Sequence, residues 1–160
     1  MCVDPEFGKQ FEALTGYQPF PWQTALFSRM AEQPADDAFP PLISVPTGLG
    51  KTAVIAVWLL ALARRLETGT LSGFPRRLIY VVNRRTVVDQ ATAVAEHIRE
   101  ALKAEALHDV AKWLRSLSVL EGDIEPVAIS TLRGELADNA EWRRDPARAA
   151  IVVGTVDMVG

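Results

Sequence analysis

The sequence predicts an α/β fold in which a mostly parallel sheet carries helices on both faces. Short apolar runs typical of strands, at residues 42–45, 77–82, 127–130 and 150–153, alternate with longer runs that have helical periodicity. A turn containing glycine joins the first predicted strand to a helix that is apolar on nearly every side. With 160 residues, the chain is long enough for one domain with a sizeable core.

The first forty residues predict two helices and a surface connection. Phe7, Phe11 and Leu14 recur at helical spacing, and Gly16 is suited to end that helix. Prolines then interrupt the chain, and a second apolar helical pattern begins at about Pro21. Residues 33–41 are rich in proline and acidic residues, which predicts a connection on the surface before a first core strand at residues 42–45.

The rest of the chain alternates helices with strands. Residues 51–66 predict a buried helix, and residues 77–82 have the β-branched and aromatic content of a buried strand. Apolar residues stepping by three and four predict helices over 87–102 and 107–117. A short strand at 127–130, a polar connection at 132–148 with one helical turn, and a strand at 150–153 complete the pattern.

The stretch LISVPTGLGKTAVIAV, residues 42–57, reads as a phosphate-binding loop. Gly48 and Gly50 allow backbone N–H groups to converge on an anion, and the positive end of the following helix adds to the attraction. Lys51 can reach the β and γ phosphates of a nucleotide, and the Thr52 hydroxyl can coordinate a phosphate-bound Mg²⁺. The expected ATP-binding residues here are Pro46, Thr47, Gly48, Leu49, Gly50, Lys51 and Thr52.

Composition places the chain among ordinary globular proteins. Apolar residues make up 49% and charged residues 23%, and the net charge of −3 gives no general attraction to nucleic acid or membrane. Any nucleic-acid binding must therefore come from local basic patches. Cys2 is the only cysteine, so a reducing cytoplasm is the simplest setting, and no apolar run is long enough to suggest a membrane partner.

The loop P-T-G-L-G-K-T resembles the first motif of superfamily 2 helicases. The general pattern G-x-x-x-x-G-K-S/T would place glycine at Val45, and these helicases commonly replace that glycine. The resemblance implies a RecA-like fold of the P-loop NTPases, with ATP and Mg²⁺ as cofactors and Lys51 as the catalytic residue. It also implies that Gln23, 28 residues before Lys51, reads adenine with its amide. We expect a helical lead-in at 1–16 and a partial helicase ATP-binding domain at 17–160.

Three further segments resemble helicase motifs that contact a nucleic-acid backbone. RLIYVVNRRTVVDQ resembles one in which a strand ends and a helix begins, LRGE resembles a glycine-bearing motif, and IVVGTVD resembles a later strand-to-helix motif. Together with the phosphate loop they imply single-stranded nucleic acid, most simply DNA, as the partner. The expected contacts are Arg84, Arg85, Thr86, Gln90, Arg133, Gly134 and Thr155.

Within that superfamily, the segment R-R-T-V-V-D-Q is most similar to the corresponding motif of the CRISPR-associated helicase-nuclease of type I interference systems. This narrower resemblance implies a role in defence against foreign DNA and a guide-RNA surveillance complex as partner. The dipeptide His108-Asp109 invites comparison with a metal-dependent nuclease, but His97 is the only other histidine. We therefore expect His108 to lie on a solvated helix face, and Trp58 and Trp113 to serve packing.

The carboxylate pair D-E-x-H/D, which such motors use to hold magnesium and orient water, does not occur in the sequence. We therefore expect the chain to be the N-terminal part of a longer motor and to be inactive as an isolated ATPase. Two alternatives remain open. A small-molecule P-loop kinase would share the strand, loop and helix, and a non-catalytic nucleotide-gated binding module would not need the carboxylates.

Overall fold

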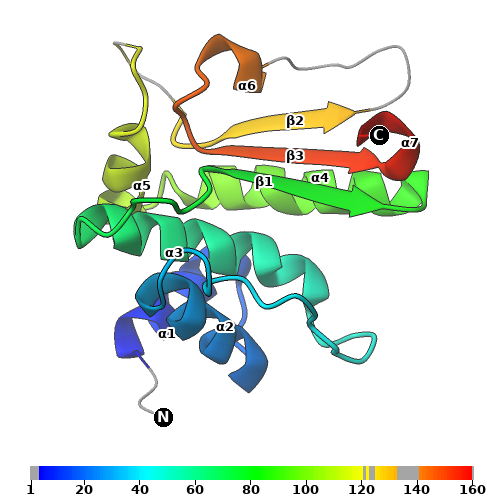
Figure 1. Ribbon diagram of the computed structural model, residues 1–160, viewed down its shortest axis with the longest axis horizontal. Coiled ribbons are helices and arrows are strands. Elements are labelled where there is room, and N and C mark those ends of the chain that lie inside the picture. The colour runs from blue at the N-terminus through cyan, green and yellow to red at the C-terminus, as the bar shows by residue number, and fades with distance from the viewer. Residues whose placement is uncertain (1–3, 121, 123–124, 133–140, 160) are drawn as a thin grey trace.

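The computed structural model describes residues 4–120, 122, 125–132 and 141–159 (Figure 1). From residue 54 onward, strands alternate with helical segments, as the sequence predicts, whereas residues 4–53 form helices and turns without a strand. The elements are α1 (Pro5–Thr15), α2 (Pro21–Glu32), a 3-10 turn η1 (Lys51–Ala53), α3 (Val54–Glu67), β1 (Arg77–Val82), α4 (Arg85–Ala101), η2 (Glu105–Leu107), α5 (His108–Arg115), β2 (Ala128–Leu132), α6 (Glu141–Arg144), β3 (Ala150–Thr155) and α7 (Val156–Val159).

Both predicted N-terminal helices are confirmed. The Asp4 carboxylate caps α1 by accepting hydrogen bonds from two N–H groups of its first turn, and Gly16 ends the helix in the left-handed region at φ +79°. Phe7 of α1 stacks on Phe27 of α2, with 4.1 Å between the ring centroids. This aromatic contact joins the two helices beneath α3 (Figure 1).

Helix α3 is the centre of the core. Every residue from Ile55 to Ala63 is buried, and α3 contacts α1, α2 and α5. This confirms the buried helix that its apolar composition predicts, although the first residues form the η1 turn. Trp58 is fully buried and donates its indole N–H to the Pro75 carbonyl at 3.2 Å, as expected for a packing role.

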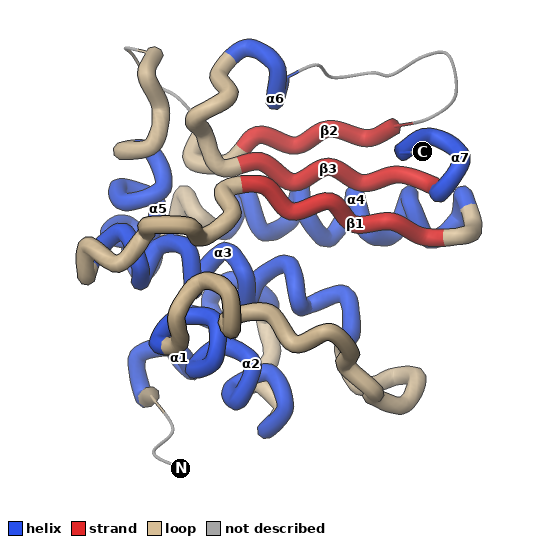
Figure 2. Tube along the Cα trace, viewed as in Figure 1, coloured by secondary structure: helices blue, strands red, loops and turns tan. Residues whose placement is uncertain are grey.

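Among the described residues, the sheet has three parallel strands in the order β1-β3-β2, which confirms the predicted α/β fold with a parallel sheet. Helix α4 contacts all three strands and lies against one face of the sheet (Figures 1 and 2). On that face, the hydroxyl groups of Thr92 in α4 and Thr131 in β2 are 3.0 Å apart and buried. Helix α5 forms within the predicted range 107–117, after the η2 turn, and His108 is exposed.

The prediction that residues 42–45 form the first core strand is wrong. In the described structure these residues belong to no strand, and the Leu42 side chain is 78% exposed. A strand is stable only when its backbone groups pair with a neighbouring strand, and no described strand lies beside this segment to accept it. The segment instead runs past α2 and lines one side of a groove of about 520 Å³.

The bounds of β1 match the prediction, but its burial does not. Leu78, Tyr80 and Val82 pack against the core, whereas Ile79 is 55% exposed and Val81 is 43% exposed, so only one face of β1 is covered. The strands β2 and β3 each extend two residues beyond the predicted runs. Among the described residues, no helix combines the length and hydropathy required for a membrane span.

Candidate functional site

The predicted phosphate loop forms a tight turn directly before α3. Gly48 and Gly50 have φ angles of +88° and +68°, a region that residues with a Cβ rarely adopt. Within the described part of the chain, the N–H groups of Gly48, Leu49 and Gly50 have no hydrogen-bond partner, and Lys51 is exposed and forms no ion pair. The turn therefore presents N–H groups and one cation to solvent, as an anion site requires.

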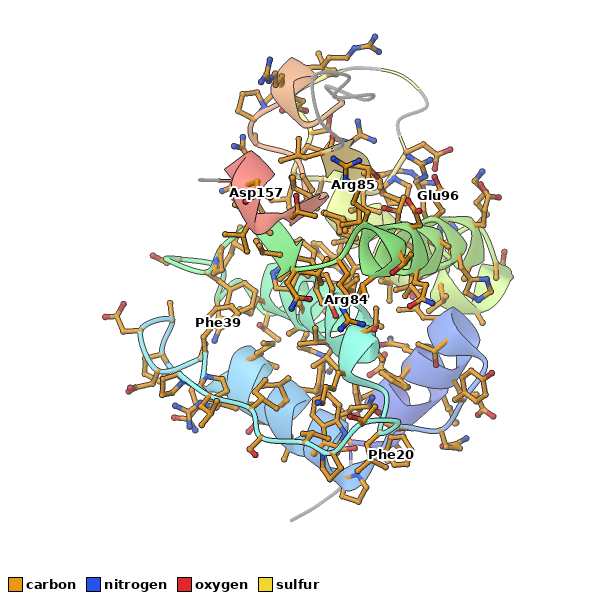
Figure 3. All side chains as sticks on the ribbon, turned by 90° about the vertical axis from the view of Figure 1, so that its right-hand side faces the viewer. Phe20, Phe39, Arg84, Arg85, Glu96 and Asp157 are labelled. Atoms are coloured by element: carbon orange, nitrogen blue, oxygen red, sulfur yellow. The ribbon has the colours of Figure 1, made fainter. Side chains whose placement is uncertain are left out.

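Two side chains in the first turn of α2 donate hydrogen bonds to backbone carbonyls of this loop. The indole N–H of Trp22 donates to the Leu49 carbonyl at 3.0 Å, and Nε2 of Gln23 donates to the Gly50 carbonyl at 3.1 Å. A Cβ added to Gly50 would lie 3.0 Å from that Nε2 atom and 3.6 Å from Cε2 of Phe20. The loop is thus packed against the start of α2, and Phe20 is labelled beside it in Figure 3.

Gln23 is only 2% exposed, and its amide has two partners inside the protein. Its Oε1 atom accepts the Phe20 N–H at 2.8 Å, and its Nε2 atom donates to Gly50. These two contacts set the orientation of the amide, since an oxygen must face the N–H and a nitrogen the carbonyl. One N–H and one lone pair remain for any contact with adenine.

The other expected nucleotide-binding residues lie along the same surface. Pro46 and Thr47 are exposed, Leu49 is half-buried, and Thr52 is half-buried in the η1 turn that opens α3. The donor set fits a magnesium-bound triphosphate, because N–H groups and an ammonium suit phosphate oxygens and a threonine hydroxyl suits a hard cation. The helix that the motif requires after the loop is present, whereas the strand before it is not.

The residues expected to contact nucleic acid gather at the carboxyl ends of the strands. Val82 of β1 pairs with Thr155 of β3, and Leu132 of β2 pairs with Gly154, so the three parallel strands end at the same edge of the sheet. Arg84, Arg85, Thr86 and Gln90 follow β1 and are exposed, and Thr155 is half-buried at the end of β3. Arg133 and Gly134 lie outside the described residues.

The two groups of residues are neighbours in space. Helix α4, which begins at Arg85, contacts the η1 turn that contains Lys51 and Thr52. Viewed toward the carboxyl ends of the strands, Arg84 lies in line with the first turn of α3, whereas Arg85 lies higher, on the side of the sheet (Figure 3). Three cations therefore share this end of a chain whose net charge is −3.

Sequence reasoning missed the role of Trp22 and Phe20 in supporting the loop. Trp22 fitted the apolar pattern of α2, and that pattern carries no information about an indole N–H that meets a carbonyl 27 residues later. The available signal was the position of Trp22 beside Gln23, which the helicase resemblance already placed near the nucleotide.

Comparison with known proteins identifies the family. No curated protein and no solved structure matches the chain. The family model described as the type III restriction enzyme, res subunit, matches residues 16–157, which is most of the sequence. This family has a DExD/H helicase-type motor domain, in agreement with the phosphate loop and the parallel sheet. The chain therefore belongs to the family of the type III restriction enzyme res subunit, a family of helicase-type ATPases.

Proposed function

We propose that the chain provides the nucleotide-binding and nucleic-acid-contacting surfaces of an ATP-dependent motor. The observation that carries this proposal is the contact between α4 and the η1 turn that follows the phosphate loop, together with the position of Arg84 and Arg85 directly after β1, at the edge where the parallel strands end. Ligands of open α/β sheets bind at this edge. A nucleotide at residues 48–52 and a strand of nucleic acid at residues 84–86 would lie next to each other, so each ligand could influence the affinity for the other directly.

Each residue has a chemical task in this proposal. The N–H groups of the loop and Lys51 hold the phosphates, and Thr52 supplies an oxygen ligand to the magnesium ion, which neutralises phosphate charge when it is bound. Gln23 offers its remaining amide groups to adenine. Arg84, Arg85, Thr86, Gln90 and Thr155 contact phosphates of the nucleic acid, as do Arg133 and Gly134 in the resemblance.

The first experiment measures binding of Mg·ATP by titration. Lys51→Ala removes the exposed cation without disturbing the core, so we expect at least a tenfold loss of affinity with an unchanged melting temperature. The matched control is Lys112→Ala, because Lys112 is an exposed lysine on α5, away from the loop. Equal affinities for ATP in the Lys51 variant and the wild type would contradict the assignment of the phosphate loop.

The second experiment measures binding of single-stranded DNA at several salt concentrations. The double variant Arg84→Ala/Arg85→Ala should bind more weakly and show a smaller salt dependence, because fewer counterions are released per contact. Arg76→Ala/Arg77→Ala is the matched control, since it removes the same charge at the opposite end of β1. If both pairs weaken binding equally, the interaction is general electrostatics and the proposed surface is wrong.

Coupling separates the motor from its alternatives. A motor binds ATP and single-stranded nucleic acid with linked affinities, whereas a small-molecule kinase shows no such linkage. A non-catalytic module would show linked binding without turnover, even when the remaining segments of a motor are supplied. The narrower proposal of CRISPR interference, with a guide-RNA complex as partner, rests on R-R-T-V-V-D-Q and is tested by pull-down with such a complex.

A further inference from the structure

The phosphate loop is held through two successive backbone carbonyls. The Leu49 carbonyl accepts from Trp22 and the Gly50 carbonyl accepts from Gln23, and both donors come from the first turn of α2. The Gly50 carbonyl also accepts the N–H of Ala53, which starts the η1 turn. A carbonyl oxygen has two lone pairs, so it can serve both partners.

Planarity of the peptide bond transmits this restraint to the other side of the loop. The structure contains no cis peptide bond among its described residues, and in a trans peptide the C=O and N–H bonds point in opposite directions. Holding the Leu49 carbonyl against α2 therefore turns the Gly50 N–H away from α2. Holding the Gly50 carbonyl in the same way directs the N–H of Lys51.

Of the two donors, Trp22 is the one with no other role in the loop region. Gln23 uses its amide oxygen to cap the start of α2 at Phe20, so it serves both the helix and the loop. The half-buried Trp22 ring packs against the core, and its indole nitrogen can only donate. Its hydrogen bond to the Leu49 carbonyl therefore has a fixed direction and comes from a ring that the core holds in place.

We propose that Trp22 is a positioning residue for phosphate binding, which acts by orienting the Gly50 N–H toward the anion without touching the nucleotide. This inference rests on the proposed function of the phosphate loop. The positioning role of Trp22 differs from recognition of adenine, because its hydrogen bond restrains the peptide units whose N–H groups face the phosphates. Loss of the indole N–H should thus weaken every ligand that carries the triphosphate, with or without adenine.

The test is Trp22→Phe, which keeps an aromatic ring and removes the N–H. Affinities for Mg·ATP and for inorganic tripolyphosphate are measured on the 160-residue chain by following backbone amide signals in NMR titrations, which also detect weak binding and do not depend on the indole that each variant removes. One lost hydrogen bond predicts that both affinities fall by the same factor, about 2- to 10-fold. A loss of affinity for ATP with an unchanged affinity for tripolyphosphate would overturn the proposal, since it would indicate that Trp22 contacts adenine.

Trp58→Phe is the matched control. It also removes an indole N–H that donates to a carbonyl, that of Pro75, and it lies in the core. This variant should lower the melting temperature and leave both affinities unchanged. If Trp58→Phe weakens phosphate binding as much as Trp22→Phe does, general destabilisation explains the effect and the proposal is wrong.

Failure of the proposed function has a different signature. If the wild type binds neither ATP nor tripolyphosphate, the phosphate-loop assignment fails and Trp22 has no anion to position. The contact itself is checked separately in the free protein, where the Trp22 indole N–H should exchange slowly with solvent. Normal binding by the wild type, together with an unaffected tripolyphosphate affinity in Trp22→Phe, would overturn only the positioning role.

Discussion

Replacing Arg65 by lysine should destabilise the protein strongly, although the charge is kept. Arg65 follows the buried part of α3, is only 3% exposed, and donates to the carbonyls of Met30 (2.6 Å), Thr70 (3.0 Å) and Gln33. Its guanidinium also lies 4.6 Å from the centre of the Phe74 ring. Burial lowers the pKa of Arg65, but a guanidinium remains charged at neutral pH. One side chain therefore joins the end of α2 to the loop that follows α3.

The cost follows from counting partners. A lysine ammonium lacks the planar fork, so it leaves at least one of the three carbonyls unsatisfied, at about 1–3 kcal/mol. Loss of the contact with the Phe74 ring adds about 0.5–2 kcal/mol. We therefore expect the free energy of unfolding to fall by about 1.5–5 kcal/mol, which for a chain of this length lowers Tm by roughly 3–20 °C.

The neighbouring residue supplies the control. Arg64 lies on the outer side of α3 and pairs with Asp4 and Glu6 at 3.2 and 3.0 Å, where solvent weakens the interaction. Arg64→Lys should cost no more than about 1 kcal/mol. Urea denaturation measures both variants, with the slope checked for two-state behaviour. The reasoning is refuted if Arg65→Lys is no less stable than Arg64→Lys.

Three further variants test the structure at other places. Gly50→Ala should lose about 1–2 kcal/mol of stability from its positive φ and should also bind tripolyphosphate more weakly, whereas Gly16→Ala should lose only stability. Thr92→Val should cost about 1–3 kcal/mol in urea denaturation because it leaves the buried Thr131 hydroxyl unpaired, and the double valine variant should be more stable than this single one. The Ser118 hydroxyl bonded to Asp145 holds the pKa of that carboxylate below its usual range. The ionised Asp145 carboxylate therefore stabilises the fold fully above the pKa of about 4 that it has in the unfolded chain, and this stabilisation is lost as the pH falls toward the lower pKa of the folded state. The difference in stability between wild type and Asp145→Asn should consequently shrink in acid.

Periodicity alone located most of the helices, because an amphipathic or buried helix satisfies its own backbone and needs only an apolar face from its surroundings. The bounds of β1 were also readable from the residues. The burial of β1 was not, since Ile79 and Val81 are exposed or covered according to whether another element packs on their face of the sheet. Which segments pack on a strand depends on contacts between distant parts of the chain, and the local sequence pattern does not determine them.

The loop P-T-G-L-G-K-T could be interpreted from the sequence because its chemistry is local. Two glycines permit the turn, Lys51 supplies the charge, and the helix after them follows from the apolar run. The arginines after β1 could likewise be assigned to a strand end. Their position next to the phosphate loop required the packing of α4 against η1, which joins segments more than thirty residues apart.

The sequence by itself determined the α/β class, the helices and the glycine turn before α3, because each depends on residues that are close along the chain. Only the tertiary structure decided that residues 42–45 stay outside the sheet, that Arg65 becomes a buried cation serving three carbonyls, and that Trp22 and Gln23 hold the loop from behind. The physical reason is the same in each case. A backbone group must find a partner, and which partner it finds depends on segments brought together by the fold.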